Sequence, residues 1–217
     1  MYSLVIFDWD GTLMDSTDRI VSCLAKAAVK TDLEVLSKEA YQHIIGLGLR
    51  EAIRDLYPGI DEDTVELMRK HYAEYFMAAE DTPSPLFAGS LHVLETLRKK
   101  NIKTAVATGK SRVGLNKVWR KTGLGEYFDT SRCADETQSK PNPQMLQEIL
   151  EELQVEPQRA LMVGDTSFDL EMAANIDMPR VGVSYGAHDI AILEQYNPLS
   201  IVDNVVDLLP IVLGANS

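Results

Sequence analysis

The strongest chemical signal in the sequence is a pair of aspartates, Asp8 and Asp10, that follows an apolar run and precedes Gly11. The run, Leu4 to Phe7, is typical of a strand buried on both faces. Side chains two positions apart on an extended chain point the same way, so both carboxylates are expected at one place. Carboxylates that close repel each other unless a cation or a shared proton relieves them. Taken alone, the pair fits a solvated turn as well as a functional site.

Further polar residues follow predicted strands or precede predicted helices. They are Thr108, Gly109 and Lys110 after strand 104–107, Asp165 and Asp169 after strand 160–163, and Lys140 before helix 143–153. In open parallel sheets, ligands bind at the carboxyl ends of the strands. Several carboxylates at one edge require a divalent cation, and an all-oxygen ligand set favours Mg²⁺. A hydroxyl, a glycine main chain and an ammonium group suit a phosphoryl group.

These segments resemble the motifs of a known superfamily. Asp8-Trp9-Asp10-Gly11-Thr12-Leu13, with Asp15-Ser16, is similar to the first motif of the haloacid dehalogenase-like hydrolases. Thr108, Lys140-Pro141 and the segment 164–169 resemble the second, third and fourth motifs, in the same order. The resemblance covers essentially the whole chain, and its overall pattern looks most like phosphoglycolate phosphatases and their near relatives.

The resemblance implies distinct roles for the two aspartates. Asp8 would be the nucleophile that attacks phosphorus and forms an aspartyl-phosphate. Asp10 would protonate the leaving oxygen and then activate water. Mg²⁺ would be held by Asp8, the main-chain carbonyl of Asp10, and Asp165.

The remaining motif residues have implied roles beside simpler structural ones. Thr108, Gly109 and Lys140 would hold the phosphoryl group. The structural alternatives are that Thr108 caps a helix and has no other role, and that Lys140 is a surface lysine. Asp169 would orient a metal-bound water or Lys140. Alternatively, it is only an acidic residue at the start of a helix, where it interacts favourably with the helix dipole. Arg50, after Gly46-Leu47-Gly48-Leu49, could reach a substrate carboxylate or second phosphate, or lie at the surface of a helix–helix turn.

The pattern of elements predicts an α/β fold, an open Rossmann-like parallel sheet with an inserted all-helical cap domain. The expected strands are 4–7, 104–107, 127–132, 160–163, 180–183 and 200–202. Only helical patterns occur between Thr17 and Glu80, and the connector Asp81–Pro85 is rich in turn-forming residues. We therefore expect a catalytic core of residues 1–15 and 85–217 and a cap of residues 16–84.

Composition narrows the partners and the compartment. The 217 residues carry a net charge of −12, which argues against nucleic acid or an anionic membrane as a partner. Cys23 and Cys133 match no metal or redox spacing, and no secretory signal or membrane span is visible, so we expect a cytoplasmic protein. The expected partner is a small phosphorylated metabolite, and the sequence leaves the oligomeric state open.

Position 10 separates the activities found in similar proteins. In the family, dehalogenases carry another residue there and phosphonatases typically carry alanine, whereas Asp10 suits an oxygen leaving group that needs a proton. The lead hypothesis is a Mg²⁺-dependent phosphatase of small phosphate monoesters such as phosphoglycolate. A β-phosphoglucomutase-like isomerase is the main alternative. A phosphonatase and a non-catalytic phospho-ligand-binding protein are further alternatives.

Overall fold

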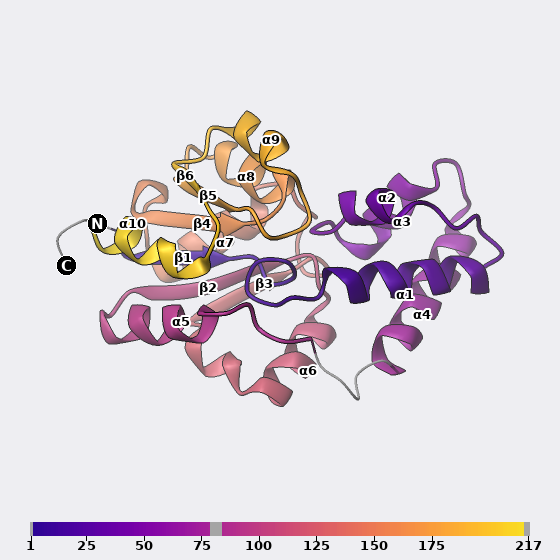
Figure 1. Ribbon diagram of the computed structural model, residues 1–217, viewed down its shortest axis with the longest axis horizontal. Helices are drawn as coiled ribbons and strands as arrows, with labels where there is room; N and C mark the ends of the chain where they lie inside the picture. Colours follow the sequence, from indigo (N-terminus) through magenta and orange to yellow (C-terminus); the bar gives the residue numbers. More distant parts are fainter. Residues whose placement is uncertain (1, 79–83, 215–217) are drawn as a thin grey trace.

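A parallel β-sheet forms the centre of the molecule in the computed structural model, which describes residues 2–78 and 84–214 (Figure 1). The strands in these residues are β1 (Leu4–Phe7), β2 (Lys103–Thr108), β3 (Thr130–Cys133), β4 (Ala160–Gly164), β5 (Arg180–Val183) and β6 (Ser200–Val202). Their spatial order is β3-β2-β1-β4-β5-β6, and all neighbours are parallel. The predicted open parallel sheet is confirmed, with β1 between β2 and β4.

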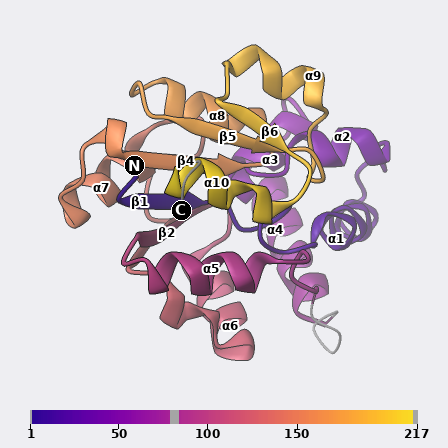
Figure 2. The same ribbon diagram turned by 60° about the vertical axis from the view of Figure 1, so that its left-hand side comes forward.

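Helices cover both faces of the sheet. One face packs against α5 (Ser90–Lys99), α6 (Arg112–Thr122) and α10 (Leu208–Leu213), and the other against α7 (Gln144–Leu153) and α8 (Ser167–Ala174). Figure 2 shows α5 and α8 on opposite sides of the strands. Along β1, Val5 and Phe7 enter one apolar cluster while Leu4 and Ile6 enter the other. This alternation explains why the strand is apolar throughout.

A separate group of helices follows β1. It consists of α1 (Thr17–Lys30), α2 (Lys38–His43), α3 (Leu49–Leu56) and α4 (Glu62–Ala78). These helices pack around an apolar cluster of their own that includes Leu24, Ile53 and Met68. Figure 1 shows them beyond the carboxyl end of β1. We call α1–α4 and their connections the helical unit.

The chain enters and leaves the helical unit at neighbouring points. The Asp15 N–H donates to the Pro85 carbonyl at 2.9 Å, so the two connections lie side by side. Residues 81–83 of the predicted connector lie outside the described residues. The division into residues 16–84 and the remainder of the chain stays a prediction.

One predicted strand is displaced along the sequence. We expected residues 127–132 to form a strand, but residues 124–127 form a 3₁₀ turn and β3 begins at Thr130. The cause is Asp129, whose main-chain N–H donates to the Thr104 carbonyl while its carboxylate accepts from the Thr104 N–H at 2.8 Å. The segment before β3 is instead held by Phe128, whose ring stacks on Trp119.

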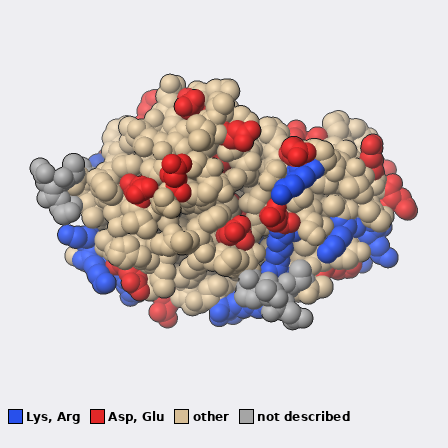
Figure 3. Space-filling view, viewed as in Figure 1, with Lys and Arg blue, Asp and Glu red and all other residues tan. Residues whose placement is uncertain are grey.

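Charged side chains of both signs are interspersed on the face that Figure 3 shows. Among the residues that are not grey, the Lys and Arg side chains form no broad patch on this face. The small α9 (Ile190–Leu193) lies near α8, and it is flanked by short turns. Among the described helices, none has the length and apolar character that crossing a membrane requires.

Candidate functional site

The ends of three neighbouring strands bring the predicted site residues together. Asp8 follows β1, Thr108 ends β2, Asp165 follows β4, Lys140 lies between β3 and α7, and Asp169 is in the first turn of α8. All five are buried, with at most 2% of any one exposed. Charged groups are rarely buried to this extent unless they are paired, so the contacts among them decide what the cluster can do.

Lys140 lies between two of the carboxylates. Its Nζ is 2.6 Å from Oδ1 of Asp8 and 2.6 Å from Oδ1 of Asp169. Burial alone would lower the pKa of Lys140, but Asp169 and Asp8 together raise it above its ordinary value. The lysine is therefore a buried cation of the site, and the surface alternative does not apply.

The three carboxylates are close enough to share a cation. One oxygen atom from each of Asp8, Asp165 and Asp169 lies within 4.8 Å of the others. Burial is the largest cause that raises the pKa of Asp8, and Lys140 only partly offsets it. Oδ2 of Asp8 is buried and has no hydrogen-bond partner among the residues that the structure describes. This unpartnered oxygen in an acidic cluster fits a bound divalent cation.

Both carboxylate oxygens of Asp165 accept hydrogen bonds from the protein. Oδ1 accepts from the Thr12 hydroxyl at 2.8 Å, and Oδ2 accepts from the Ala187 N–H at 2.7 Å. A Cβ atom at Gly11 or Gly186 would lie 2.2 Å or 2.1 Å from an atom of the Asp165 side chain. The two glycines therefore permit the chain to close around this carboxylate. Even so, burial first and Asp169 second raise its pKa to about 7.

Asp169 serves two structural purposes at once. Its Oδ2 accepts from the N–H and the hydroxyl of Thr166, at 3.1 Å and 2.7 Å, and so completes a capping box at the start of α8. Its Oδ1 contacts Lys140. Because Oδ1 is paired with an ammonium group and Oδ2 accepts two hydrogen bonds, the structure favours Asp169 as the partner of Lys140 over a direct metal ligand. Each oxygen of Asp165 accepts only one hydrogen bond from the described residues and keeps a lone pair for a cation.

Asp10 is bound by two residues, Lys110 and Ser16, to which the sequence assigned no part in the chemistry. Lys110 Nζ lies 2.9 Å from both carboxylate oxygens, and the Ser16 hydroxyl donates to Oδ1 at 2.6 Å. Lys110 also lies 4.8 Å from the ring centroid of Phe76 on α4. A signal for Lys110 was its position directly after Thr108 and Gly109, at the end of a strand. Nothing in the sequence places Phe76 beside it.

Thr108 and Gly109 lie at the turn between β2 and α6. Ser111 caps α6 by accepting from the Gly114 N–H, so Thr108 is not the helix cap. The buried Thr108 hydroxyl accepts from the Lys110 N–H at 3.2 Å. A Cβ at Gly109 would lie 2.5 Å from the Leu47 carbonyl oxygen, so the segment 46–48 closes on this turn.

A cavity of about 390 Å³ lies between the helical unit and the strand ends. Its lining includes Asp8, Asp10 and Lys110 together with many apolar and aromatic residues such as Leu24, Tyr72 and Phe76. This is room for a phosphate group and a small organic moiety.

Arg50 also lines this cavity, but its guanidinium contacts Glu66 on α4, and its side chain is half exposed. Arg69 lines the cavity as well and pairs with the same glutamate at 2.8 Å. Glu66 thus offsets the charge of two arginines in the cavity wall.

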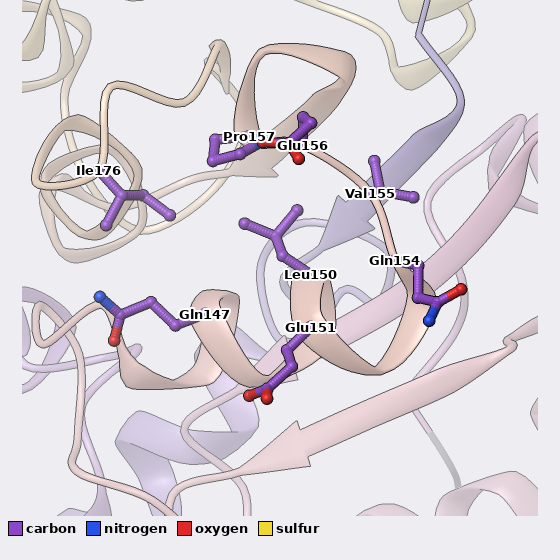
Figure 4. A pocket seen from close by; sticks show the side chains of 8 residues that line it. All are labelled: Gln147, Leu150, Glu151, Gln154, Val155, Glu156, Pro157 and Ile176. Carbon is purple, nitrogen blue, oxygen red and sulfur yellow. The ribbon is translucent and has the colours of Figure 1, made fainter.

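A second hollow, of about 420 Å³, lies along α7, away from the carboxyl ends of the strands (Figure 4). Leu150, Val155 and Ile176 form its apolar part, and Glu151 and Glu156 are at its edge. None of its eight lining residues is basic, so the lining offers no positive charge to a phosphate.

Comparison with known proteins identifies similar chains over nearly the full length. The family model described as haloacid dehalogenase-like hydrolase matches residues 5–183. Pyrophosphatase PpaX of Bacillus cereus is 30% identical and aligns over 98% of this chain and 97% of its own. Phosphoglycolate phosphatase of Agrobacterium fabrum is 27% identical over 95% and 91%. A solved structure from Clostridium acetobutylicum, described as a "predicted phosphatase", has a TM-score of 0.87 at 26% identity and covers 98% and 99%.

Removal of the buried lysine should destabilise the fold. We expect Lys140→Met to lower the free energy of unfolding at pH 8 without added metal by about 3 kcal/mol or more, because it leaves two adjacent carboxylates uncompensated. Urea unfolding measures this change. Lys38→Met, which removes an exposed ion pair with Asp18, is the matched control and should have no measurable effect. Equal stability of the two variants would contradict the electrostatic role of Lys140.

Proposed function

The chain belongs to the haloacid dehalogenase-like hydrolase family, and from this premise we propose that it is a Mg²⁺-dependent phosphatase of small phosphate monoesters. One observation carries the proposal above all others: Asp8 Oδ2 lies buried beside two more carboxylates without a partner in the described part of the chain. Such an oxygen is available both to a cation and to an electrophilic phosphorus atom. The names of the similar phosphatases support the same reaction class.

Asp8 is the proposed nucleophile. Its carboxylate attacks phosphorus, the bond to the leaving oxygen breaks, and an aspartyl-phosphate forms. Asp8, Asp165 and the main-chain carbonyl of Asp10 would hold Mg²⁺, which supplies positive charge that offsets the repulsion between carboxylate and phosphate. Lys140, held by Asp8 and Asp169, contributes a fixed positive charge from within the protein.

Asp10 is the proposed proton carrier. It donates a proton to the leaving oxygen and later takes one from the water that hydrolyses the aspartyl-phosphate. The Ser16 hydroxyl and the Lys110 ammonium fix the position of its carboxylate through three hydrogen bonds.

The phosphoryl group is proposed to lie against Thr108, Gly109 and Lys140, and the leaving group to extend into the cavity beneath the helical unit. In this role residues 16–84 are a cap, and residues 1–15 and 85–217 are the catalytic core. The 390 Å³ cavity supports a small metabolite as the substrate. Phosphoglycolate is the compound that we propose to test first, and Arg50 would reach its carboxylate only by leaving Glu66.

Loss of the nucleophile should abolish turnover without loss of the fold. We expect Asp8→Asn to lower phosphate release by at least about 1,000-fold on any active compound in a panel of phosphoglycolate, pyrophosphate, β-glucose 1-phosphate and p-nitrophenyl phosphate. The thermal midpoint without metal should stay equal or rise, because burial and two neighbouring carboxylates disfavour the Asp8 charge. Asp15→Asn, at an exposed position nearby, is the control. Retained turnover in Asp8→Asn would contradict the proposed mechanism.

Metal binding should be linked to pH through Asp165. With its pKa raised to about 7, the metal-free folded protein keeps a proton there that the unfolded chain loses near the ordinary value of 3.8. Stability without metal should therefore fall as the pH rises from about 4 through 7. Because Mg²⁺ competes with this proton, it should raise the thermal midpoint more at pH 8 than at pH 6, relative to chelator. An equal increment at both pH values would argue against Asp165 as a ligand. Asp165→Asn should reduce the difference, and Asp8, whose pKa is also raised, accounts for the part that remains.

Lys110 should matter most for leaving groups that need a proton. We expect Lys110→Ala to lower kcat by about 100-fold for an alkyl phosphate, because the position of Asp10 is lost. The loss for p-nitrophenyl phosphate, whose leaving group departs as a stable anion, should be under about tenfold. Lys117→Ala removes another cation that lines the same cavity and is the control. Equal losses on both substrates would contradict the action of Lys110 through Asp10.

A further inference from the structure

His188 joins the helical unit to the segment that carries the acidic cluster. It lies in the connection after β5 and is 3% exposed. Its Nδ1 is 3.0 Å from the Ser167 main-chain nitrogen at the start of α8, and its Nε2 is 2.9 Å from the His43 carbonyl oxygen at the end of α2. The ring is stacked on that of His43, at 5.1 Å between centroids, and lies edge-on to Phe168.

The two contacts determine the protonation of the ring. The Ser167 N–H is a donor, so Nδ1 of His188 must be the acceptor and carry no proton. Nε2 then carries the proton and donates it to the His43 carbonyl. Burial lowers the pKa of His188, which agrees with a neutral ring. The imidazole of His188 therefore connects α8 to the end of α2, accepting a hydrogen bond at Nδ1 and donating one at Nε2.

The Nδ1 end of His188 contacts Ser167, two residues after Asp165. Main-chain groups already hold Asp165 itself. The Ala187 N–H donates to Asp165 Oδ2, and the His188 N–H donates to the Asp165 carbonyl at 3.3 Å. Neither bond requires an imidazole at position 188. The side chain of His188 consequently adds a function other than holding the carboxylate.

The Nε2 end of His188 contacts His43, the residue directly before the segment 44–48. After His43 the chain continues through residues 44–48, where the carbonyl oxygens of Gly46 and Leu47 face Gly109. The Gly48 N–H donates to the Ser139 hydroxyl at 2.8 Å, just before Lys140. The segment 44–48 is thus fastened at one end by His188 and at the other by Ser139.

We propose that His188 is a positioning residue that docks the segment 44–48 over the substrate, through the bond from Nε2 to the His43 carbonyl. This inference rests on the proposed function, because it assigns the substrate to the cavity that the segment covers. The docked segment orients the leaving group and keeps water away from it. His188 itself touches neither the reacting atoms nor the metal.

Two substitutions separate the two ends of the His188 ring. The amide of His188→Asn reaches the position of Nδ1 and can keep the Ser167 bond, whereas the longer His188→Gln places its amide near Nε2 and can keep the His43 bond. We expect His188→Asn to raise KM about tenfold, the effect of one lost hydrogen bond, and His188→Gln to restore most of the affinity. The Mg²⁺ concentration for half-maximal activity should change less than twofold in both, because the main-chain bonds to Asp165 remain.

Hydrogen exchange tests the docking without turnover. The amides of residues 44–48 should exchange about tenfold faster in His188→Asn than in the wild type, and His188→Gln should resemble the wild type. His92→Ala, on the exposed side of α5, is the control and should change neither KM nor exchange. Faster exchange in His188→Gln than in His188→Asn, or a shift in Mg²⁺ dependence as large as the shift in KM, would overturn the proposal. If the wild type shows no turnover, the proposed phosphatase function fails, while the exchange result still judges the docking.

Discussion

The repulsion among three buried carboxylates is the constraint on which the site depends. Asp8, Asp165 and Asp169 bring three negative charges when ionised, and Lys140 brings one positive charge, which leaves an excess of two. Burial prevents water from screening this excess. A divalent cation carries the charge that would balance it, whereas protonation is the other way to relieve it. The raised pKa values of Asp8 and Asp165 express this competition.

The topology of the sheet creates this concentration of charge. β1 lies between β2 and β4, so residues far apart in sequence end at one edge. Lys140 and Asp8 are 132 positions apart, and Thr12 and Asp165 are 153 positions apart, yet both pairs are in hydrogen-bond contact. The strands and the apolar clusters on both faces supply the stability against which the repulsion acts. The site is therefore electrostatically unfavourable without a cation, and the apolar packing of the core compensates for it.

The sequence was most informative where chemistry coincides with a strand end. The segments around Asp8, Thr108 and Asp165 combine an apolar run with an abrupt polar change, and this pattern predicts both a strand and a cluster of polar groups at its carboxyl end. The strand near residue 130 was displaced because Asp129, an ordinary polar residue in the sequence, bonds across to Thr104. The sequence did not predict the ion pair between Arg50 and Glu66 for a similar reason, because this pair depends on how α3 packs against α4. Contacts between packed elements leave no local pattern.

The two aspartates of the first motif are held by different parts of the molecule. Asp8 is bound by Lys140, which belongs to the sheet-containing part of the chain. Asp10 is bound by Ser16, directly before α1, and by Lys110, which lies against Phe76 of α4. We therefore expect a substitution in α4 at Phe76 to act on Asp10 more directly than on Asp8. In the proposed mechanism, Asp10 serves the leaving group and Asp8 the phosphoryl group. Changes in the helices can thus alter which leaving groups are accepted without disturbing attack at phosphorus.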